Sequence, residues 1–148
     1  TEKLVELFIT YVFSMGNKNN FYTFALNLKR TKMKRNKIIY YVATGLLTVL
    51  LLFSAGMYFF NHEEVAGMFT VFGYPTYIIY PYAVVKVLGL VAIWFVSSKT
   101  IKEWAYAGFS FAFTLAFFAH VMVGDGEQMG AVIALVLLAV SYIYKETK

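Results

Sequence analysis

Four long apolar stretches, separated by short polar connections, dominate the chain. They cover residues 38–60, 77–96, 104–123 and 129–144. A helix rises about 1.5 Å per residue, so about 17–25 residues cross the roughly 30 Å hydrocarbon core of a membrane. The first three stretches are long enough, and the fourth is long enough when Gln128 and Lys145 form its interfacial ends. The pattern predicts an all-α fold, an integral membrane bundle of four transmembrane helices within one domain over residues 33–148.

The segments that flank these stretches are in turn basic and acidic along the chain. The segments 61–76 and 124–128 contain no Lys or Arg and carry Glu63, Glu64, Asp125 and Glu127 instead. Lys and Arg are enriched in cytoplasmic loops, so we predict that both termini are cytoplasmic. The cations of that side are Lys29, Arg30, Lys32, Lys34, Arg35, Lys37, Lys99, Lys102, Lys145 and Lys148.

The connection between the first two spans has a helical pattern of its own. Asn61 suits an N-cap, Glu63 and Glu64 favour a helix N-terminus, and Gly73 favours a helix end. We predict a short interfacial helix on the outer membrane surface. The alternative is a lid folded over the mouth of the bundle. The apolar residues that recur at helical spacing are Val65, Met68, Phe69 and Phe72.

Residues 1–32 form an N-terminal extension without sustained periodicity. Its apolar run is too short to span a membrane, and it lacks the cleavage motif of a signal peptide. Met33 followed by a basic cluster and the first span is typical of a natural start. We expect the extension to be translated upstream sequence or a disordered segment, with an interfacial amphipathic helix as the alternative.

The composition supports a membrane protein. The chain is 60% hydrophobic and 14% charged, whereas soluble domains are about 45–50% apolar and about 25% charged. The net charge is +5, and the basic residues behind it are explained by the orientation of the spans, so we expect the lipid bilayer and no nucleic acid as a partner. There is no cysteine, which excludes disulfides and thiol chemistry.

Lys86 stands near the middle of the second span, where a charge marks a functional candidate. Three interpretations stay open. The ammonium is a structural charge satisfied by hydroxyls, or it binds a polar ligand head such as a quinone carbonyl or a carboxylate, or it carries a proton. Tyr82 and Gly89 share its helical stripe, and the glycine permits close helix approach.

A second polar stripe follows the third span through Tyr106, Ser110 and His120. We expect it to face inward together with Lys86 and the hydroxyls of the first span, which belong to Thr44, Thr48 and Ser54. Lys86 and His120 would then line one outward-opening cavity, although His120 also fits a hydrogen-bonded helix end. The fourth span has almost no polar residue, so we expect a packing helix exposed to lipid.

The chain shows no hydrolase, phosphate-loop or dinucleotide motif, and no cluster with metal-ligand spacing. We therefore predict no catalytic residue, no metal site and no intrinsic cofactor.

Four segments resemble the DoxX-like family of small bacterial membrane proteins over about residues 37–148. They are GYPTY (73–77), KVLG (86–89), KEWAYAGF (102–109) and HVMVGD (120–125). The resemblance implies a four-helix bundle in a bacterial inner membrane and directs attention to Lys86, Lys102, Glu103, Tyr106, His120 and Asp125. Relatives in the wider DoxX group include a subunit of a thiosulfate–quinone oxidoreductase, and others are tied to redox or maturation of partner proteins. Without cysteine, a thiol-based role does not transfer.

The function expected from residues and resemblance is an accessory membrane subunit, not an enzyme on its own. It would bind a quinone or another amphiphile within the bundle and support a membrane redox or maturation partner protein. The candidate ligand-binding residues are Lys86, His120, Tyr82, Tyr106 and Ser110. The alternatives are an assembly subunit that docks a partner helix and, less favoured, a small solute or proton transporter, which a homo-oligomer would make workable.

Overall fold

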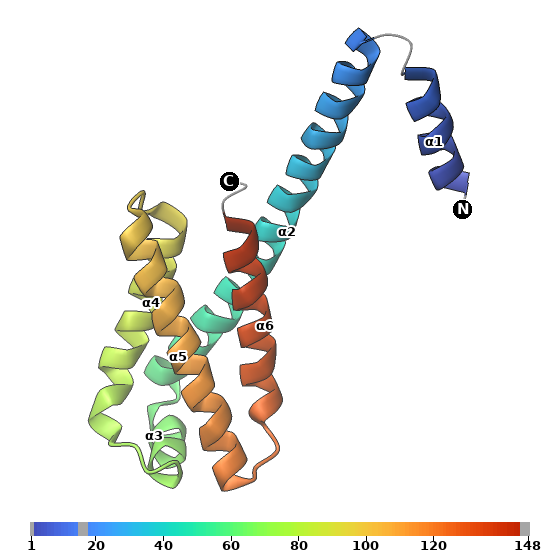
Figure 1. Cartoon of the computed structure of the whole chain (residues 1–148). Coiled ribbons are helices and arrows are strands. Elements are labelled where there is room, and N and C mark those ends of the chain that lie inside the picture. Colours follow the sequence, from blue (N-terminus) through green and yellow to red (C-terminus); the bar gives the residue numbers. More distant parts are fainter. Residues whose placement is uncertain (1, 15–17, 146–148) are drawn as a thin grey trace.

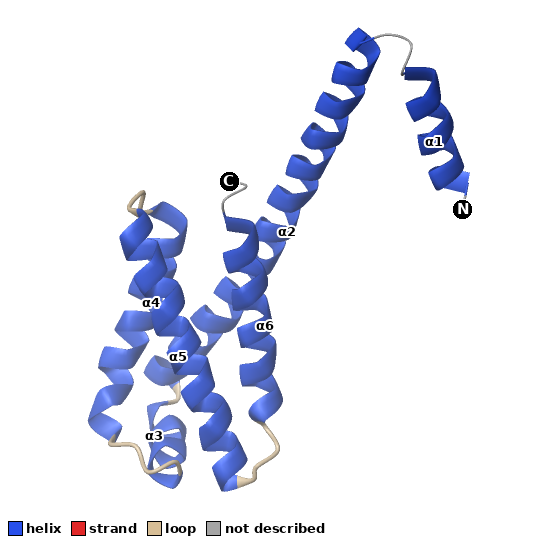
Figure 2. Cartoon of the chain, in the orientation of Figure 1, coloured by secondary structure: helices blue, strands red, loops and turns tan. Residues whose placement is uncertain are grey.

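The computed structural model describes residues 2–14 and 18–145, and every regular element in these ranges is a helix (Figure 2). The all-α prediction is therefore confirmed. Lys148, one of the cations assigned to the cytoplasmic side, lies outside the described residues. The helices are α1 (Glu2–Ser14), α2 (Lys18–Phe60), α3 (His62–Val71), the short 3-10 helix η1 (Thr76–Ile78), α4 (Ile79–Phe95), α5 (Lys99–Val123) and α6 (Gln128–Tyr144).

Helices α2, α4, α5 and α6 pack against one another around an apolar core. α2 contacts α4 and α6, and α5 contacts the same two helices from the other side. Burial of aliphatic and aromatic side chains joins all four helices, because each of them contributes to one core cluster. Its buried members are Leu47, Leu51, Leu90, Ile93, Tyr106, Phe109 and Leu138.

Many large apolar side chains point away from this core, as expected for a surface that faces lipid. Phe53, Phe111 and Phe95 are exposed by 70%, 73% and 81%. Within the described residues, three helical segments are long and apolar enough to cross a membrane, namely Tyr22–Phe60, Thr76–Phe95 and Lys99–Val123. α6 has 17 residues and is shorter. The fold is thus a helical assembly suited to a membrane, and a fourth crossing by α6 stays a prediction.

The two ends of the bundle differ in charge. The projecting part of α2, the turn between α4 and α5, and the end of α6 lie at one end, whereas α3 and the turn between α5 and α6 lie at the other (Figure 1). The basic segments predicted to share one side therefore share one end, and the acidic connections lie opposite. Which end faces the cytoplasm stays a prediction.

Helix α2 begins well before the predicted first span. It runs without a break from Lys18 into the bundle, and α1 precedes it far from the bundle (Figure 1). The extension before Met33 is thus helical over its described residues. Neither the interfacial alternative nor the proposed start is tested by this geometry.

Helix α3 ends as the sequence predicts. Gly73 adopts a φ of 76°, a left-handed conformation that costs a residue without Cβ little. The N–H groups of Tyr74 and Gly73 donate to the carbonyls of Phe69 and Thr70 at 2.8 and 3.0 Å, which is the Schellman pattern. The chain thereby reverses toward η1.

Helix α3 turns its apolar face toward the bundle, as the lid alternative describes. Val65 is 1% exposed and Phe69 8% exposed, and both belong to a cluster with Ile79. Partly buried residues of α2 and α4, including Tyr58 and Tyr82, pack against this cluster. The helix therefore covers the aromatic residues at this end of the bundle.

Helix α6 packs against the bundle with one face and exposes apolar side chains on the other, among them Ile133 and Val136, which agrees with the packing helix expected from its apolar sequence. It contacts both α2 and α5, and Ala131, Ala134, Leu138 and Ser141 are buried. Small residues on one face allow close approach of neighbouring helices. The alternation of small and large side chains within an apolar run was the signal that could have shown this face.

Candidate functional site

Lys86 lies inside the bundle, 7% exposed, where α4 meets α2. Its Nζ donates a hydrogen bond of 2.8 Å to the Ser54 hydroxyl. The same Nζ lies 4.1 Å from the centroid of the Tyr58 ring and 4.6 Å from that of Tyr82. Both distances fall within the roughly 6 Å range of cation–π attraction. A hydroxyl and two aromatic faces thus surround the ammonium group, which we call the Lys86 box.

The Lys86 box is closed by the chain itself. No carboxylate of the described residues pairs with Lys86, and its box residues come from α2 and α4 only. Tyr58 packs edge-on against Phe69 of α3, with ring centroids 5.6 Å apart. Lys86 does not line the groove between α5 and α6 that is described below. Of the three interpretations, the geometry agrees best with a structural charge that hydroxyl and ring groups satisfy.

His120 and Asp125 form a second polar site at the end of α5. Their Nδ1 and Oδ2 atoms are 2.7 Å apart, and the backbone N–H of Glu127 donates to Oδ1 of Asp125 at 2.9 Å. These two contacts hold the pKa of the Asp125 carboxyl below its usual value, the Glu127 N–H having the larger effect. The His120 ring also packs edge-on against Phe72, at 4.9 Å between centroids. His120 is therefore a hydrogen-bonded helix-end residue in this geometry.

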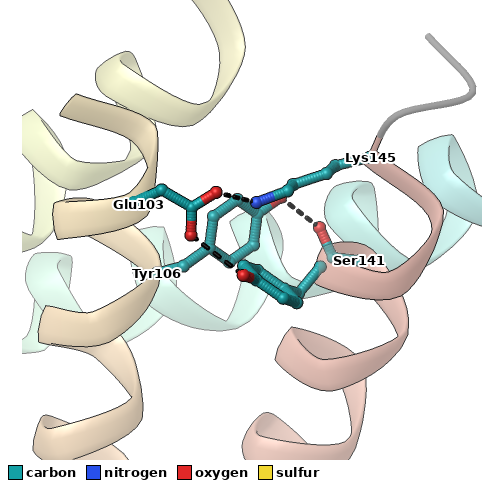
Figure 3. A network of polar contacts seen from close by, with 5 residues as sticks. Glu103, Tyr106, Ser141 and Lys145 are labelled. Carbon is teal, nitrogen blue, oxygen red and sulfur yellow. Dashed lines mark hydrogen bonds and ion pairs between the residues drawn. The ribbon is translucent and has the colours of Figure 1, made fainter. Parts of the chain in front are cut away.

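A third polar site joins α5 to α6 at the basic end of the bundle (Figure 3). Glu103 accepts hydrogen bonds from Lys145 and, at 3.0 Å, from the Tyr142 hydroxyl. Lys145 also lies 3.7 Å from the centroid of the Tyr142 ring. The ammonium group of Lys145 and the phenol of Tyr142 thus share one carboxylate where the start of α5 meets the end of α6.

Beneath this ion pair, Ser141 connects three helices by hydroxyl contacts. Its Oγ lies 2.8 Å from the Tyr106 hydroxyl and 2.7 Å from Oγ1 of Thr44, and Ser141 is fully buried. A buried hydroxyl without a partner costs free energy, so these contacts fix the register of α6 against α2 and α5. Figure 3 shows Tyr106 directed at Ser141 and Glu103 directed at Lys145.

A groove of about 540 Å³ runs between α5 and α6 next to this network. Glu103, Tyr106 and Tyr142 lie at its polar end, and the rest of its lining is mostly apolar. Ala107 and Ala139 line it on opposite helices, and their small side chains leave the depression open. Its volume lies within the range of small-molecule sites, about 300–1,000 Å³. The remaining lining residues are Ser110, Leu135 and Leu138.

The structure divides the five predicted ligand-binding residues among three places. Lys86 and Tyr82 meet in the Lys86 box, Tyr106 and Ser110 line the groove, and His120 pairs with Asp125. Lys86 and His120 each have partners of their own and neither lines the groove, so the outward-opening cavity that they were expected to share stays a prediction. The inward stripe of α5 is corrected at Ser110, which is exposed and faces the groove.

Several residues of these sites were not expected from the sequence. Tyr58, Tyr142 and Ser141 were not singled out as site residues. Lys102, which the resemblance favoured, is half-buried in the first turn of α5, whereas its neighbour Glu103 belongs to the network. A lone hydroxyl in an apolar helix, as at Ser141, was the available signal, since such groups bond across helices.

Long apolar helices, an outward-facing apolar surface and buried polar side chains define a membrane-embedded helical protein. The sequence profile of the DoxX-like family matches residues 42–142. The chain therefore belongs to the DoxX-like family, as its four motif segments predicted. No curated protein and no solved structure matches it.

Proposed function

We propose that this DoxX-like protein is an accessory subunit that holds a quinone or a similar amphiphile in the groove between α5 and α6. The groove itself is the observation that carries the proposal. It offers an open depression beside hydrogen-bonding groups, whereas the Lys86 box is filled by its own side chains. The amphiphile would be presented to a membrane redox or maturation partner, in a bacterial inner membrane that the chain crosses four times.

The two ends of the groove match the two ends of such a ligand. The Glu103 carboxylate and the Tyr142 hydroxyl lie at the polar end, with Lys145 bound to Glu103. Together they offer donors and acceptors to a carbonyl or hydroxyl head. Leu135 and Leu138 lie about one to two helical turns deeper and suit a ring or the start of an apolar tail. No redox centre is needed in the chain, because the quinone would carry the electrons.

Binding of a decyl-substituted benzoquinone tests this proposal. We would purify the protein in mild detergent, add the quinone and count bound molecules by native mass spectrometry. Ala139→Phe fills the groove and should weaken binding at least tenfold. Val136→Phe places the same ring on the exposed face of α6, outside the groove lining, and should bind like the parent.

Lys86→Met separates the groove from the site inside the bundle. If Lys86→Met abolishes binding while Ala139→Phe binds normally, the ligand lies beside Lys86 as the sequence first suggested, and the groove proposal fails. If the parent binds no quinone at all, the amphiphile proposal fails.

A partner helix is the second candidate for the groove. Ser110 and Tyr142 are exposed at its rim, so a transmembrane helix could lie along α5 and α6. A photoreactive side chain introduced at Ala139 distinguishes the two, since it would cross-link in cells to a protein in one case and to a small amphiphile in the other.

A further inference from the structure

The part of α2 between residues 29 and 37 carries the densest charge of the molecule. Six of these nine residues are basic, and no Asp or Glu occurs between residues 7 and 62. All six side chains are exposed, and none has a carboxylate partner among the described residues. We call them the basic collar; its members are Lys29, Arg30, Lys32, Lys34, Arg35 and Lys37.

The basic collar lies just where α2 leaves the bundle. The first buried side chain of α2 after it is Tyr40, which is 2% exposed. At about 1.5 Å per residue, the six residues lie about 4–17 Å before Tyr40 along the helix axis. The headgroup layer of a bilayer is about 5–8 Å thick on each side, and charge attraction extends about 8–10 Å beyond it. With Tyr40 placed at the edge of the hydrocarbon core, the collar would lie in the headgroup layer and in the zone of its surface potential.

The arrangement of the collar suits many small anions on all sides better than a single partner with one flat anionic surface. Successive residues of a helix turn by about 100°, so the six side chains point around the whole circumference. Headgroups of a bilayer surround a crossing helix on all sides in the same way. Six cations are more than the orientation of a span requires. The other two basic segments hold far fewer among their described residues, namely Lys99 and Lys102 at the start of α5, and Lys145 after α6.

We infer that the basic collar is a binding site for anionic phospholipids, which it concentrates around α2. The phosphate oxygens of the headgroups would take the hydrogen bonds and charge pairs that the chain itself does not supply. Juxtamembrane clusters of four to eight Lys and Arg bind anionic lipids by this attraction. The inference does not depend on the occupant of the groove.

Lipid retention from a mixed bilayer tests the inference. The protein would be placed in nanodiscs of equal phosphatidylglycerol and phosphatidylcholine, released into the gas phase, and its bound lipids counted by native mass spectrometry. We expect the parent to retain at least threefold more phosphatidylglycerol than phosphatidylcholine. The excess should shrink as salt rises from about 50 to 500 mM, because salt screens exposed charges.

Two variants locate the effect. Replacing all six collar residues with Gln should remove the excess, whereas exchanging each Lys for Arg and each Arg for Lys should keep it. Because the full neutralisation could disturb insertion, Lys29, Arg30 and Lys32 are also replaced alone, which leaves three cations beside the span. This smaller variant should lose about half of the excess.

Three results would overturn the inference. The parent could retain both lipids equally, the variant with three Gln could retain as much phosphatidylglycerol as the parent, or an acidic protein or nucleic acid could occupy the collar in place of lipid after purification from cells.

Discussion

Single side chains show how this protein keeps polar groups inside an apolar assembly. Lys86 is held by Ser54, Tyr58 and Tyr82, which together replace the water that an ammonium group loses on burial. At the end of α5, Asp125 is held by a backbone N–H and by His120. Lys86 finds partners on α2 as well as on its own helix, whereas the partners of Asp125 are close neighbours in the chain. In both cases the stability of the site depends on these partners.

The Lys86 box predicts an asymmetry between its two polar members. Ser54→Ala removes the hydroxyl that accepts from Nζ and should destabilise the protein by about 1–3 kcal/mol, because a buried donor is left unpaired. Lys86→Met removes the charge together with its need for a hydrogen-bond acceptor, so the stability of the protein should stay unchanged or rise. Thermal unfolding in detergent measures both. In the Lys86→Met background, Ser54→Ala should have almost no effect, and a loss as large as in the parent would refute the box.

The Asp125 site predicts a dependence of stability on acid. Its pKa is lowered in the folded protein, so the folded state holds its proton less strongly than the unfolded state does. The resulting stabilisation is complete above the ordinary Asp pKa of about 4 and is lost as pH falls through the lowered value.

Unfolding temperatures of the parent and Asp125→Asn between about pH 6 and pH 2.5 test this. Asn lacks the titrating carboxylate, so the gap between the two proteins should be widest near pH 6 and should close toward pH 2.5. Glu127→Gln keeps the backbone N–H and serves as the control. A gap that does not change with pH would rule out this role for the carboxylate.

At the scale of elements, small residues and hydroxyls decide how closely the helices pack. Gly89 of α4 faces the ring of Phe109 on α5, and a Cβ at position 89 would lie 2.6 Å from its Cζ. Phe109 stacks on Phe113 within α5, so the ring is held in place. On the other side of the bundle, Ser141 joins α6 to its two neighbours. These contacts turn four apolar helices into one specific arrangement.

Gly89→Ala should therefore destabilise the contact between α4 and α5. The added methyl group forces the Phe109 ring to shift in a packed core, which costs about 1–3 kcal/mol. Gly108→Ala is the matched control, because a Cβ there meets nothing within 4 Å. Thermal unfolding should show a loss for the first variant and none for the second. Phe109→Leu combined with Gly89→Ala should recover part of the loss, and equal behaviour of the two glycine variants would contradict the close approach.

The whole molecule is organised by the separation of its charges. The basic collar, the turn between α4 and α5, and Lys145 lie at one end, and α3 with its glutamates lies at the other (Figure 1). A chain without cysteine allows this arrangement to be tested in the membrane with single thiols.

Single cysteines should report four crossings. Glu64→Cys and Glu127→Cys, in the acidic connections, should react with a membrane-impermeant thiol reagent in intact cells. Thr100→Cys, in the exposed first turn of α5, should react only after the membrane is opened. The parent, which has no thiol, is the control for background labelling. Reaction of Thr100→Cys and Glu127→Cys from the same side would show that α5 does not cross the membrane.

The helical class, the membrane setting and the family followed from the sequence because they depend on local properties. Apolar length, the position of basic residues and the stop at Gly73 can be read along the chain. The inward position of Lys86 also followed, since a charge avoids lipid. The candidate site was predicted only in part. Tyr106 and Ser110 were expected as ligand-binding members of an inward stripe shared with His120, and the structure places them in the lining of the groove.

What the tertiary structure decided was which distant residues meet. The pairing of Lys86 with Ser54 and Tyr58, and of Ser141 with Tyr106 and Thr44, depends on the rotation of each helix about its axis. An apolar helix carries little sequence signal for that rotation, because lipid and neighbouring helices are similarly apolar. Small residues and single hydroxyls set it through packing and hydrogen bonds across helices. The sequence by itself therefore determined that the chain forms apolar helices, and the contacts between those helices alone created the Lys86 box, the network of Glu103 and the groove beside it.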